Sequence, residues 1–461
     1  MQRPRFVNRA DELGILDRWW DGSHPDFALV WGRRRVGKTA LIQRFSQDKR
    51  TVFHTGAGRP RADELAVLSR AAASAGLQDG VRDLTASPFR DWDEALDVMA
   101  RLAAEEPLLL VLDEFTELTA MSPELPGIMR AFWDRAHGHT RLRILVSGSA
   151  VRTLGAMIEE RAPLFGRFDT ILQVHPFRPH EAALMLPGLP AGERAVAWGL
   201  LGGTPLYLSW WDQESSVDEN VRRLFTDSDA RMLQEGQLLL TTEGDTTGIA
   251  GTVLRAVGAG RTKHGEIMDA VGTQPARALD SLASLKLIER RLPITEAGSS
   301  KRVRYAVSDN FLRFWLKVLD PHLSSIERGL GASVADVVVA SINDHMGFAW
   351  EEAFRNHLAL MASRGDLRSP AVAIGPWWNA DNSVEIDAVA LTGQARTPFL
   401  VGEAKWARKA DGARLAAGLA RAAAALPGDI SDLDYALCAR ETVTDAPPGA
   451  LVLTAEEIFG V

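Results

Sequence analysis

One stretch of the chain has the residue types and the spacing that bind nucleotide phosphates. It follows the pattern Gly-x-x-x-x-Gly-Lys-Thr, the signature of a phosphate-binding loop. Its glycines let the backbone turn N–H groups toward an anion, and the amino end of the following helix adds partial positive charge. Lys38 is expected to reach the β- and γ-phosphates, and the Thr39 hydroxyl is expected to ligate Mg²⁺. The predicted residues of this ATP site are Gly32, Arg33, Arg34, Arg35, Val36, Gly37, Lys38, Thr39 and Ala40.

An acidic pair ends a later apolar run, residues 107–112, which reads as a buried parallel strand. Asp113 is expected to hold Mg²⁺, usually through water, and Glu114 is expected to polarise the attacking water. The alternative is a buried strand with a solvated acidic end. Because the pair follows a phosphate-binding loop, we interpret it as the metal-binding and catalytic half of an ATPase site.

Three polar residues further along are candidates to complete that site. Ser147 and Ser149 end another apolar run, and in an open α/β sheet the carboxyl ends of the strands face the ligand. Either serine could sense the γ-phosphate, and the alternative is an ordinary strand-to-loop turn. Arg167 precedes a strand and is a candidate for stabilising transition-state charge on the phosphate, with a surface ion pair as the alternative.

A second group of charged residues lies near the end of the chain. One strand-like segment carries Asp387, and the next carries Glu403 and Lys405. Residues two apart on a strand share a face, so Glu403 lies beside Lys405, and Glu385 and Val389 lie beside Asp387. Two adjacent strands can therefore bring two acids and a lysine to one point.

That combination suits hydrolysis of a phosphodiester assisted by a metal ion. Asp387 and Glu403 offer hard oxygen ligands for Mg²⁺, which lowers the pKa of its bound water. Lys405 would position or deprotonate that water and offset the phosphate charge. Glu351, on a preceding helix, would orient a ligand or supply another. Each piece alone is ordinary, because acidic residues and Glu-x-Lys are common on exposed strands.

These residues need an α/β framework to position them. Asn8 can cap a leading helix that either covers the adenine or only packs. Helices are expected between residues 61 and 104, with a break near Ser87-Pro88. Apolar runs predict the strands of a parallel sheet at 27–31, 51–54, 107–115, 142–149 and 170–172.

Residues 245–307 show a different pattern, in which three short helices precede two alternating strands. This order is typical of a winged helix-turn-helix. Between Arg255 and Arg304 there are 10 Lys/Arg and 5 Asp/Glu, so the segment is locally basic. It would either contact DNA phosphates or pack on the nucleotide and transmit its state. The basic residues expected at the wing are Arg290, Arg291, Lys301, Arg302 and Arg304.

The composition limits the kind of protein. The chain has 461 residues, a net charge of −8 and a pI near 5.8, which argues against bulk attraction to nucleic acid but not against a local basic face. The single cysteine, Cys438, rules out an internal disulfide and a cysteine-based zinc site. No apolar run spans a bilayer and the amino terminus is not a signal peptide, so we expect a cytoplasmic protein without membrane contact. A homo-oligomer is compatible with this composition.

Two resemblances become specific at this point. Phe6-Val7-x-Arg9-x-x-Glu12-Leu13, the phosphate loop, Leu112-Asp113-Glu114-Phe115, Val146-Ser147-Gly148-Ser149 and Pro163-Leu164-Phe165-Gly166-Arg167 together resemble the prokaryotic ATPases of the STAND/AAA+ type, over about residues 1–240. The resemblance implies an ATP-driven switch. Residues 340–440 resemble the PD-(D/E)xK nuclease superfamily, which implies a site of Glu351, Asp387, Glu403 and Lys405. Ile386 stands where that pattern has proline, a departure that leaves the acidic ligands intact.

The expected architecture is a P-loop parallel sheet with a helical lid, then a winged helix-turn-helix, then an α/β domain like a restriction endonuclease. Its main functional hypothesis is an ATPase switch that controls a Mg²⁺-dependent nuclease acting on DNA. The alternatives are an ATP-regulated DNA-binding or scaffold protein with a non-catalytic nuclease fold, and an ATPase that signals without nucleic acid. The predicted parts are the ATPase core at 1–180, the lid at 181–244, the winged helix at 245–310, a helical linker at 311–345 and the nuclease-like domain at 346–461.

Overall fold

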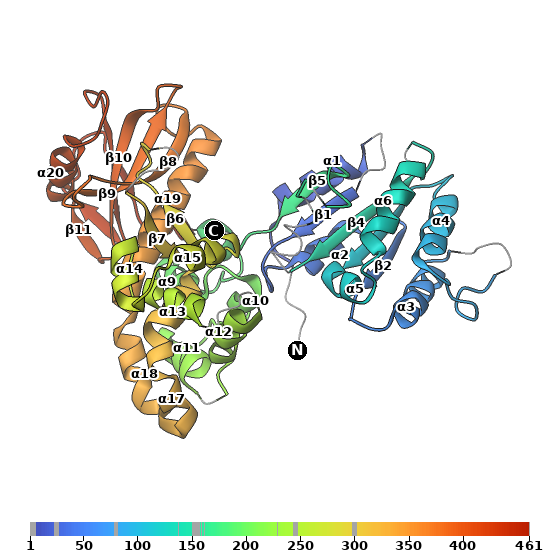
Figure 1. The fold of residues 1–461 in the computed structure, drawn as a ribbon. Helices are drawn as coiled ribbons and strands as arrows, with labels where there is room; N and C mark the ends of the chain where they lie inside the picture. The colour runs from blue at the N-terminus through green and yellow to red at the C-terminus, as the bar shows by residue number, and fades with distance from the viewer. Residues whose placement is uncertain are drawn as a thin grey trace. The chain divides into compact units, whose positions relative to one another are not determined.

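The computed structural model divides into two compact units, Met1–His175 and Pro176–Val461, which are described one at a time. Figure 1 traces the chain through both. No helix among the described residues has both the length and the apolar character needed to cross a membrane. The structure describes residues 6–22, 27–77, 82–136, 138–149, 157, 159–160, 162–227, 229–242, 248–296 and 302–460.

The first unit is built on a five-stranded sheet in the order β2-β3-β4-β1-β5, with every neighbouring pair parallel. Its elements are α1 (Ala10–Trp20), β1 (Phe27–Trp31), α2 (Lys38–Phe45), β2 (Thr51–Thr55), α3 (Arg61–Ser74), α4 (Trp92–Leu102), β3 (Leu108–Asp113), α5 (Phe115–Met121), α6 (Leu125–Ala136), β4 (Leu142–Gly148) and β5 (Phe168–Gln173). The predicted α/β fold with a parallel sheet is confirmed for this unit, and all five predicted strands are present.

Helices cover both faces of this sheet, which explains why its strands are almost continuously apolar. Leu110 and Leu112 of β3 pack into the cluster under α3, α4, α5 and α6. Leu109 and Val111 of the same strand pack into the cluster under α1 and α2. Because the strands run parallel, their carboxyl ends share one edge, where the phosphate loop, the acidic pair and the two serines all follow their strands.

The second unit begins with helices, continues through three helices and a two-stranded antiparallel hairpin, and returns to helices before its sheet. The first group is α8 (Pro179–Ala183), α9 (Ala191–Leu201), α10 (Pro205–Leu208), α11 (Val217–Val221), the π-helical turn η1 (Arg222–Thr226) and α12 (Arg231–Thr242). The middle group is α13 (Ile249–Gly258), α14 (His264–Val271), α15 (Ala276–Ser284), β6 (Ile288–Arg291) and β7 (Arg304–Val307). The third is α16 (Asn310–Phe314), η2 (Trp315–Leu319), η3 (Asp320–His322), α17 (Leu323–Ser325), η4 (Ile326–Leu330) and α18 (Gly331–Ala340).

A mixed sheet closes the second unit, in the order β14-β12-β10-β9-β8. Strand β9 runs antiparallel to both β8 and β10, whereas β10, β12 and β14 are mutually parallel. Figure 1 shows α19 and α20 on opposite sides of this sheet, in agreement with the separate core clusters to which they belong. The elements are α19 (Ile342–Arg364), β8 (Ala371–Trp378), β9 (Glu385–Thr392), β10 (Thr397–Lys405), β11 (Lys409–Asp411), α20 (Gly412–Ala423), β12 (Asp434–Ala439), β13 (Thr442–Thr444), β14 (Leu451–Leu453) and α21 (Ala455–Phe459).

The long helix α19 ties the helical part of the second unit to its sheet. His345 hydrogen-bonds the Gly199 carbonyl oxygen of α9 at 2.8 Å, and Phe354 approaches Gly402 of β10. The chain end returns as well, because Arg194 of α9 donates to the Phe459 carbonyl oxygen at 2.8 Å. These contacts explain why residues 176–461 form one compact unit, although the pattern of elements divides them into several parts. The predicted boundaries at 244, 310 and 345 stay predictions.

Candidate functional site

The phosphate loop has the strand–loop–helix context that the sequence predicts. It leaves β1 at Trp31 and enters α2 at Lys38. Gly32 has φ +152°, and a Cβ there would lie 2.4 Å from the Val174 carbonyl oxygen, so only glycine fits. Gly37 caps α2 in the left-handed conformation, with φ +92°. The loop therefore requires glycine at both ends, for lack of space at Gly32 and for its left-handed backbone at Gly37.

The lysine and threonine of the loop point into the site. Lys38 is only 5% exposed, and its ammonium donates to the carbonyl oxygens of Gly32 and Arg33, each at 2.9 Å. The Thr39 hydroxyl donates to the Asp113 carboxylate at 2.9 Å. A lysine held inside the loop by backbone carbonyls is placed to exchange them for phosphate oxygens, which are stronger acceptors. Arg34, Arg35, Val36 and Ala40 lie in the loop and the first turn of α2, as predicted.

Asp113 joins the loop to the centre of the sheet. It is 1% exposed at the end of β3, and its second carboxylate oxygen accepts a hydrogen bond from the fully buried Ser147 hydroxyl of β4. A buried carboxylate that accepts two hydroxyl groups remains a good ligand for a cation, because neither partner carries charge. The residues present therefore fit Mg²⁺ bound by Thr39 and Asp113.

Glu114 stands beside Asp113 in a strained backbone conformation. Its φ is +49°, in the left-handed region that residues with a Cβ rarely adopt, and it precedes the first residue of α5. Its carboxylate accepts a hydrogen bond from the Ser149 hydroxyl at 3.2 Å. The structure therefore brings Glu114 and Ser149 together, and Asp113 and Ser147 together, at one edge of the sheet.

Arg167 is not brought to this site. It lies just before β5, and its carbonyl oxygen accepts from the Phe27 N–H at the beginning of β1, whereas the phosphate loop follows the opposite end of β1. Its guanidinium pairs with Asp134 of α6 at 3.0 Å. Because a parallel strand places its two ends at opposite edges of the sheet, the proposed role at the nucleotide of its own chain is wrong. The arrangement observed is the alternative, a surface ion pair.

Arg9 stands in the motif that precedes the phosphate loop, and its neighbours in sequence predict no role for it at the site. The structure places its guanidinium, 3% exposed, against the phosphate loop, where it donates to the Val36 carbonyl oxygen at 2.9 Å. The only signal in the sequence was the motif that precedes the loop. Spacing alone does not reveal this contact, because 27 residues separate the two partners.

The acidic residues of the second unit also converge. Asp387 lies on β9, and the antiparallel register that pairs Ala388 with Gly402 places it opposite Glu403 of β10. The Asp387 carboxylate accepts from the Ala404 N–H at 2.9 Å, and the Lys405 ammonium pairs with the Glu403 carboxylate. Directly opposite residues of an antiparallel pair have Cβ atoms about 5 Å apart. The expected convergence of Asp387, Glu403 and Lys405 is observed.

Strand alternation does not account for the position of Asp387, however. Ile386 and Val389 both pack into the cluster beneath α20, although they are three residues apart, and the pairing of β8 with β9 shifts register between Gly375 and Trp377. Such irregularities redirect side chains at the ends of strands. The predicted regular face of Glu385, Asp387 and Val389 is therefore interrupted, and Asp387 sits at the interruption.

The ionisable side chains of this cluster shift one another's pKa values. Burial, together with the nearby Glu351 and Glu403 carboxylates, raises the pKa of Asp387 to about 7, against the effect of the Ala404 N–H. Burial also raises the pKa of Glu351, and Arg355 opposes this. Burial lowers the pKa of Lys405, but its hydrogen bond with Glu403 and the surrounding carboxylates more than offset this and raise it. The carboxylates of Asp387 and Glu351 thus resist ionisation, while the ammonium of Lys405 stays protonated beside them.

Glu351 reaches the group from α19, with Arg355 one turn further along. Arg355 lies 3.8 Å from the Glu351 carboxylate and donates to the Asp387 carbonyl oxygen at 2.8 Å. No cluster of three His, Cys, Asp or Glu among the described residues is close enough to enclose a metal ion. Mg²⁺ usually takes only one or two carboxylates and completes its shell with water. Asp387 and Glu403 match that number of carboxylates, and their role as Mg²⁺ ligands stays a prediction.

The arginines expected at the wing mostly contact other parts of the second unit. Arg304 donates both to Glu385, at 2.9 and 3.0 Å, and to Asn382. Arg302 donates to the Trp378 carbonyl oxygen at 3.0 Å and pairs with Glu296, and Arg291 pairs with Glu289. Lys301 lies outside the described residues, and Arg290 is exposed. Arg302 and Arg304 therefore bind to strands of the carboxyl-terminal sheet, at Trp378 of β8 and Glu385 of β9.

The similarities to known proteins support an ATPase for the first site. For the second region they give only a family of unknown function. Residues 6–210 match a family model described as an ATPase domain predominantly from Archaea. Residues 315–415 match one described as archaeal and bacterial proteins of unknown function. An uncharacterized protein of Methanocaldococcus jannaschii is 25% identical over 410 residues, 87% of this chain and 87% of that protein. An uncharacterized ATP-binding protein of the same organism is 47% identical over 45 residues, 10% of this chain and 76% of that protein.

Among solved structures, a Walker-type ATPase of Pyrococcus abyssi is similar with a TM-score of 0.54 and 19% identity, over 69% of this chain and 99% of that one. At this identity the likeness concerns the fold alone, and it agrees with the parallel sheet and phosphate loop described above. Residues 6–210 are therefore similar to an archaeal ATPase domain, whose parallel sheet and phosphate loop the first unit shares, and residues 315–415 are similar to archaeal and bacterial proteins of unknown function.

Proposed function

We propose that ATP binding and hydrolysis in the first unit control a Mg²⁺-dependent nuclease in the second unit that acts on DNA. The observation that supports the nuclease is that Asp387 and Glu403 lie opposite each other on β9 and β10. Lys405 forms an ion pair with Glu403, and Glu351 lies close enough to raise the pKa of Asp387. Acids that crowd together in a partly buried place cost stability, so their presence together suggests a cation or a substrate that relieves the repulsion.

Each residue of the cluster has a separate role in the proposed hydrolysis of a phosphodiester. Asp387 and Glu403 hold Mg²⁺, which when bound lowers the pKa of a coordinated water. Because Glu403 keeps the Lys405 ammonium protonated, that lysine offsets the phosphate charge and does not deprotonate the water. Glu351 takes the proton as the water oxygen bonds to phosphorus and one phosphorus–oxygen ester bond breaks. The leaving oxygen takes its proton from solvent.

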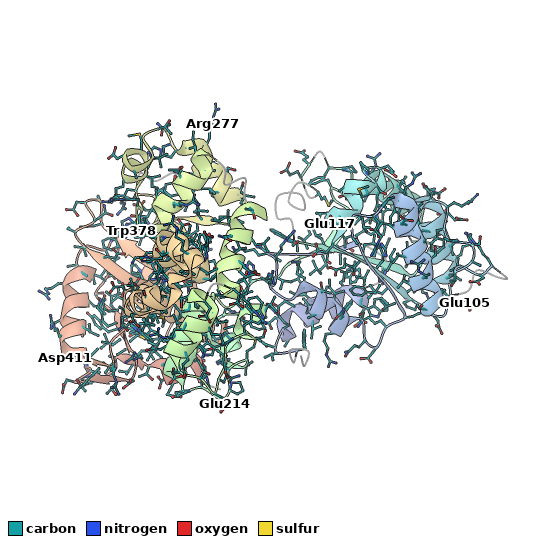
Figure 2. The ribbon with its side chains drawn as sticks, turned by 90° about the horizontal axis from the view of Figure 1, so that it is seen from below. Glu105, Glu117, Glu214, Arg277, Trp378 and Asp411 are labelled. Atoms are coloured by element: carbon teal, nitrogen blue, oxygen red, sulfur yellow. The ribbon has the colours of Figure 1, made fainter. Side chains whose placement is uncertain are left out.

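The helices and hairpin that precede this region would carry the DNA. We propose that α13, α14, α15 and the β6–β7 hairpin form a winged helix whose third helix, α15, faces the duplex. Arg277 near the start of α15 is exposed, and Figure 2 shows it pointing away from the rest of its unit. An exposed arginine on that helix suits DNA better than Arg291, Arg302 and Arg304, which are already bound to carboxylates and carbonyls.

A second candidate function is ATP-regulated DNA binding without cleavage. The ion pair between Lys405 and Glu403 favours it, because a lysine that neutralises a proposed metal ligand is also the arrangement of a site that no longer binds metal. In this case the carboxyl-terminal fold would hold a partner or a scaffold. The two functions differ in whether Mg²⁺ and Lys405 are needed for any chemistry.

The experiment measures cleavage of linear and single-stranded DNA with Mg²⁺ and ATP by the full chain and by Lys405→Ala. Lys409→Ala, an exposed lysine four residues further on, is the matched control. We expect wild type and Lys409→Ala to cut and Lys405→Ala to lose at least about a hundredfold in rate, since one transition-state contact supplies about that much. Equal cutting by all three would sink the nuclease. DNA binding without cutting in every protein would favour the second candidate.

ATP binding and hydrolysis by the first unit are measured separately from DNA cleavage. Lys38→Ala should abolish ATP binding, and Glu114→Gln should keep binding while hydrolysis stops. DNA cutting that is unchanged in both variants would show that the two activities are not coupled, even where each is real.

A further inference from the structure

Arg9 occupies a position that links two segments of the first unit. It is buried immediately before α1, and one nitrogen of its guanidinium donates to two backbone carbonyl oxygens, that of Val36 at 2.9 Å and that of His175 at 2.8 Å. A second guanidinium nitrogen, Nη1, donates to the Glu12 carboxylate at 2.7 Å. Val36 belongs to the phosphate loop, and His175 is the last residue of the first unit.

The backbone at Arg9 is shaped for this contact. Asn8 and Arg9 both have positive φ, +56° and +71°, and two successive left-handed residues with side chains are unfavourable unless the surroundings require them. The buried guanidinium supplies that requirement, since its charge is offset by Glu12 and its Nη2 donates to two carbonyl oxygens. A residue placed only to cap or pack α1 would not need this backbone.

The contact with Val36 fixes a peptide plane that ATP needs. The Val36 carbonyl and the Gly37 N–H belong to the same planar peptide unit and point in opposite directions. By holding the carbonyl oxygen, Arg9 sets the direction of the Gly37 N–H, one of the loop groups that face a bound phosphate. Arg9 therefore acts on phosphate binding through the backbone, without touching the nucleotide itself.

The contact with His175 joins the same guanidinium to the end of the unit. This segment already lies against the other end of the phosphate loop. The Val174 N–H donates to the Trp31 carbonyl oxygen at 2.7 Å, and the Val174 carbonyl approaches Gly32 so closely that no Cβ fits. Residues 174–175 are thus bound to the start of the loop directly and to its end through Arg9.

We infer that Arg9 is a positioning residue that couples occupancy of the phosphate loop to the segment at which the chain leaves the ATPase unit. When a triphosphate enters, Lys38 exchanges the carbonyl oxygens of Gly32 and Arg33 for phosphate oxygens, and the loop peptides adjust. Because Arg9 holds Val36 and His175 with one nitrogen, the adjustment is transmitted to residues 174–175. The inference rests on ATP binding by the first unit and does not require a nuclease.

The test compares wild type with Arg9→Lys and Arg9→Ala in the full chain. Lysine keeps the charge but lacks the planar fork that serves both carbonyls and Glu12. Arg44→Lys, at an exposed arginine of α2, is the matched control. Affinity for ATP is measured by calorimetry, and amide hydrogen exchange is measured for peptides covering 172–178, with and without saturating ATP.

We expect Arg9→Lys to bind ATP about tenfold more weakly, the size of one lost hydrogen bond to a charged group. At saturating ATP, the change in exchange that the nucleotide causes at 172–178 should be present in wild type and Arg44→Lys and absent in Arg9→Lys. A purely structural role would raise exchange with and without ATP and leave the nucleotide effect intact. That outcome, normal ATP affinity in Arg9→Lys, or no nucleotide effect in wild type would each overturn the inference. Should Arg9→Ala fail to fold, Arg9→Lys still decides it, and failure of wild type to bind ATP would instead refute the ATPase.

Discussion

The carboxylate of Asp387 should make the protein less stable as the pH rises, and removing its charge should reverse this. Its pKa in the folded chain is about 7, against an ordinary value of 3.8, because it is buried beside Glu351 and Glu403. Between these two values the folded chain holds a proton that the unfolded chain has lost. The free energy of unfolding therefore falls as the pH rises from about 4 to about 7, and the full cost is present above pH 7.

The size of this effect follows from the pKa difference of about 3. At about 1.4 kcal/mol per pKa unit, the upper bound is about 4 kcal/mol, and sharing of protons with Glu351 reduces it to about 2 to 4 kcal/mol. Asp387→Asn removes the charge and keeps an oxygen for the Ala404 N–H. Without divalent metal at pH 8, the variant should therefore be more stable than wild type by about 2 to 4 kcal/mol, and at pH 4 the two should be similar.

The assay is urea unfolding with EDTA at pH 4, 6 and 8, followed at pH 8 by a titration with Mg²⁺ or Mn²⁺. A cation that binds Asp387 and Glu403 should stabilise wild type as its concentration rises and leave Asp387→Asn unchanged. Asp366→Asn, at an exposed acid after α19, is the matched control and should behave as wild type. If Asp387→Asn is no more stable than wild type at pH 8, the crowding of acids is not as described. If metal does not stabilise wild type, the region is no cation site.

Three further predictions concern other parts of the molecule. Gly32→Ala should destabilise the first unit by about 2 kcal/mol or more in urea unfolding, because the new Cβ would lie 2.4 Å from the Val174 carbonyl oxygen; unchanged stability would contradict the packing at the loop. Ser149→Ala should lower kcat for ATP about tenfold with little change in KM, since Ser149 orients Glu114; steady-state kinetics with an unaltered kcat would refute that role. Burial lowers the pKa of His345 to about 3, so its neutral ring stays uncharged in the folded chain while the unfolded chain takes up a proton below pH 6.5. The contribution of His345 to stability should therefore fall by about 3 kcal/mol between pH 6.5 and 4.5, opposite in sign to that of Asp387, and the difference in stability between wild type and His345→Gln in urea titrations should change by this amount; a constant difference would locate the effect elsewhere.

Much of the first unit could be predicted from local pattern. A buried parallel strand is a short apolar run, and its site residues follow its carboxyl end in sequence, so the loop, the acidic pair and the serines could be placed before any coordinates were considered. Arg167 shows the limit of this reasoning. Its distance from the loop depends on which end of β5 it lies beside and on the strand order, and neither is contained in its neighbours in sequence.

In the second unit, too, residue spacing predicted some features and only packing decided others. Residue types and two-residue spacing predicted that Asp387, Glu403 and Lys405 could meet, because antiparallel neighbours bring opposite residues together. The register shift near Asp387, the burial that raises its pKa and the docking of the wing arginines on the sheet edge were not predictable in this way.

The sequence by itself determined the strands and helices of the first unit and the residue types of its phosphate loop, since these are encoded by residues close together in the chain. Only the tertiary structure decided which charges lie within a few ångströms of one another and which carbonyls Arg9 joins. The physical reason is that burial and electrostatic coupling depend on distances between residues that are remote in sequence, and those distances are set when the sheets and helices pack.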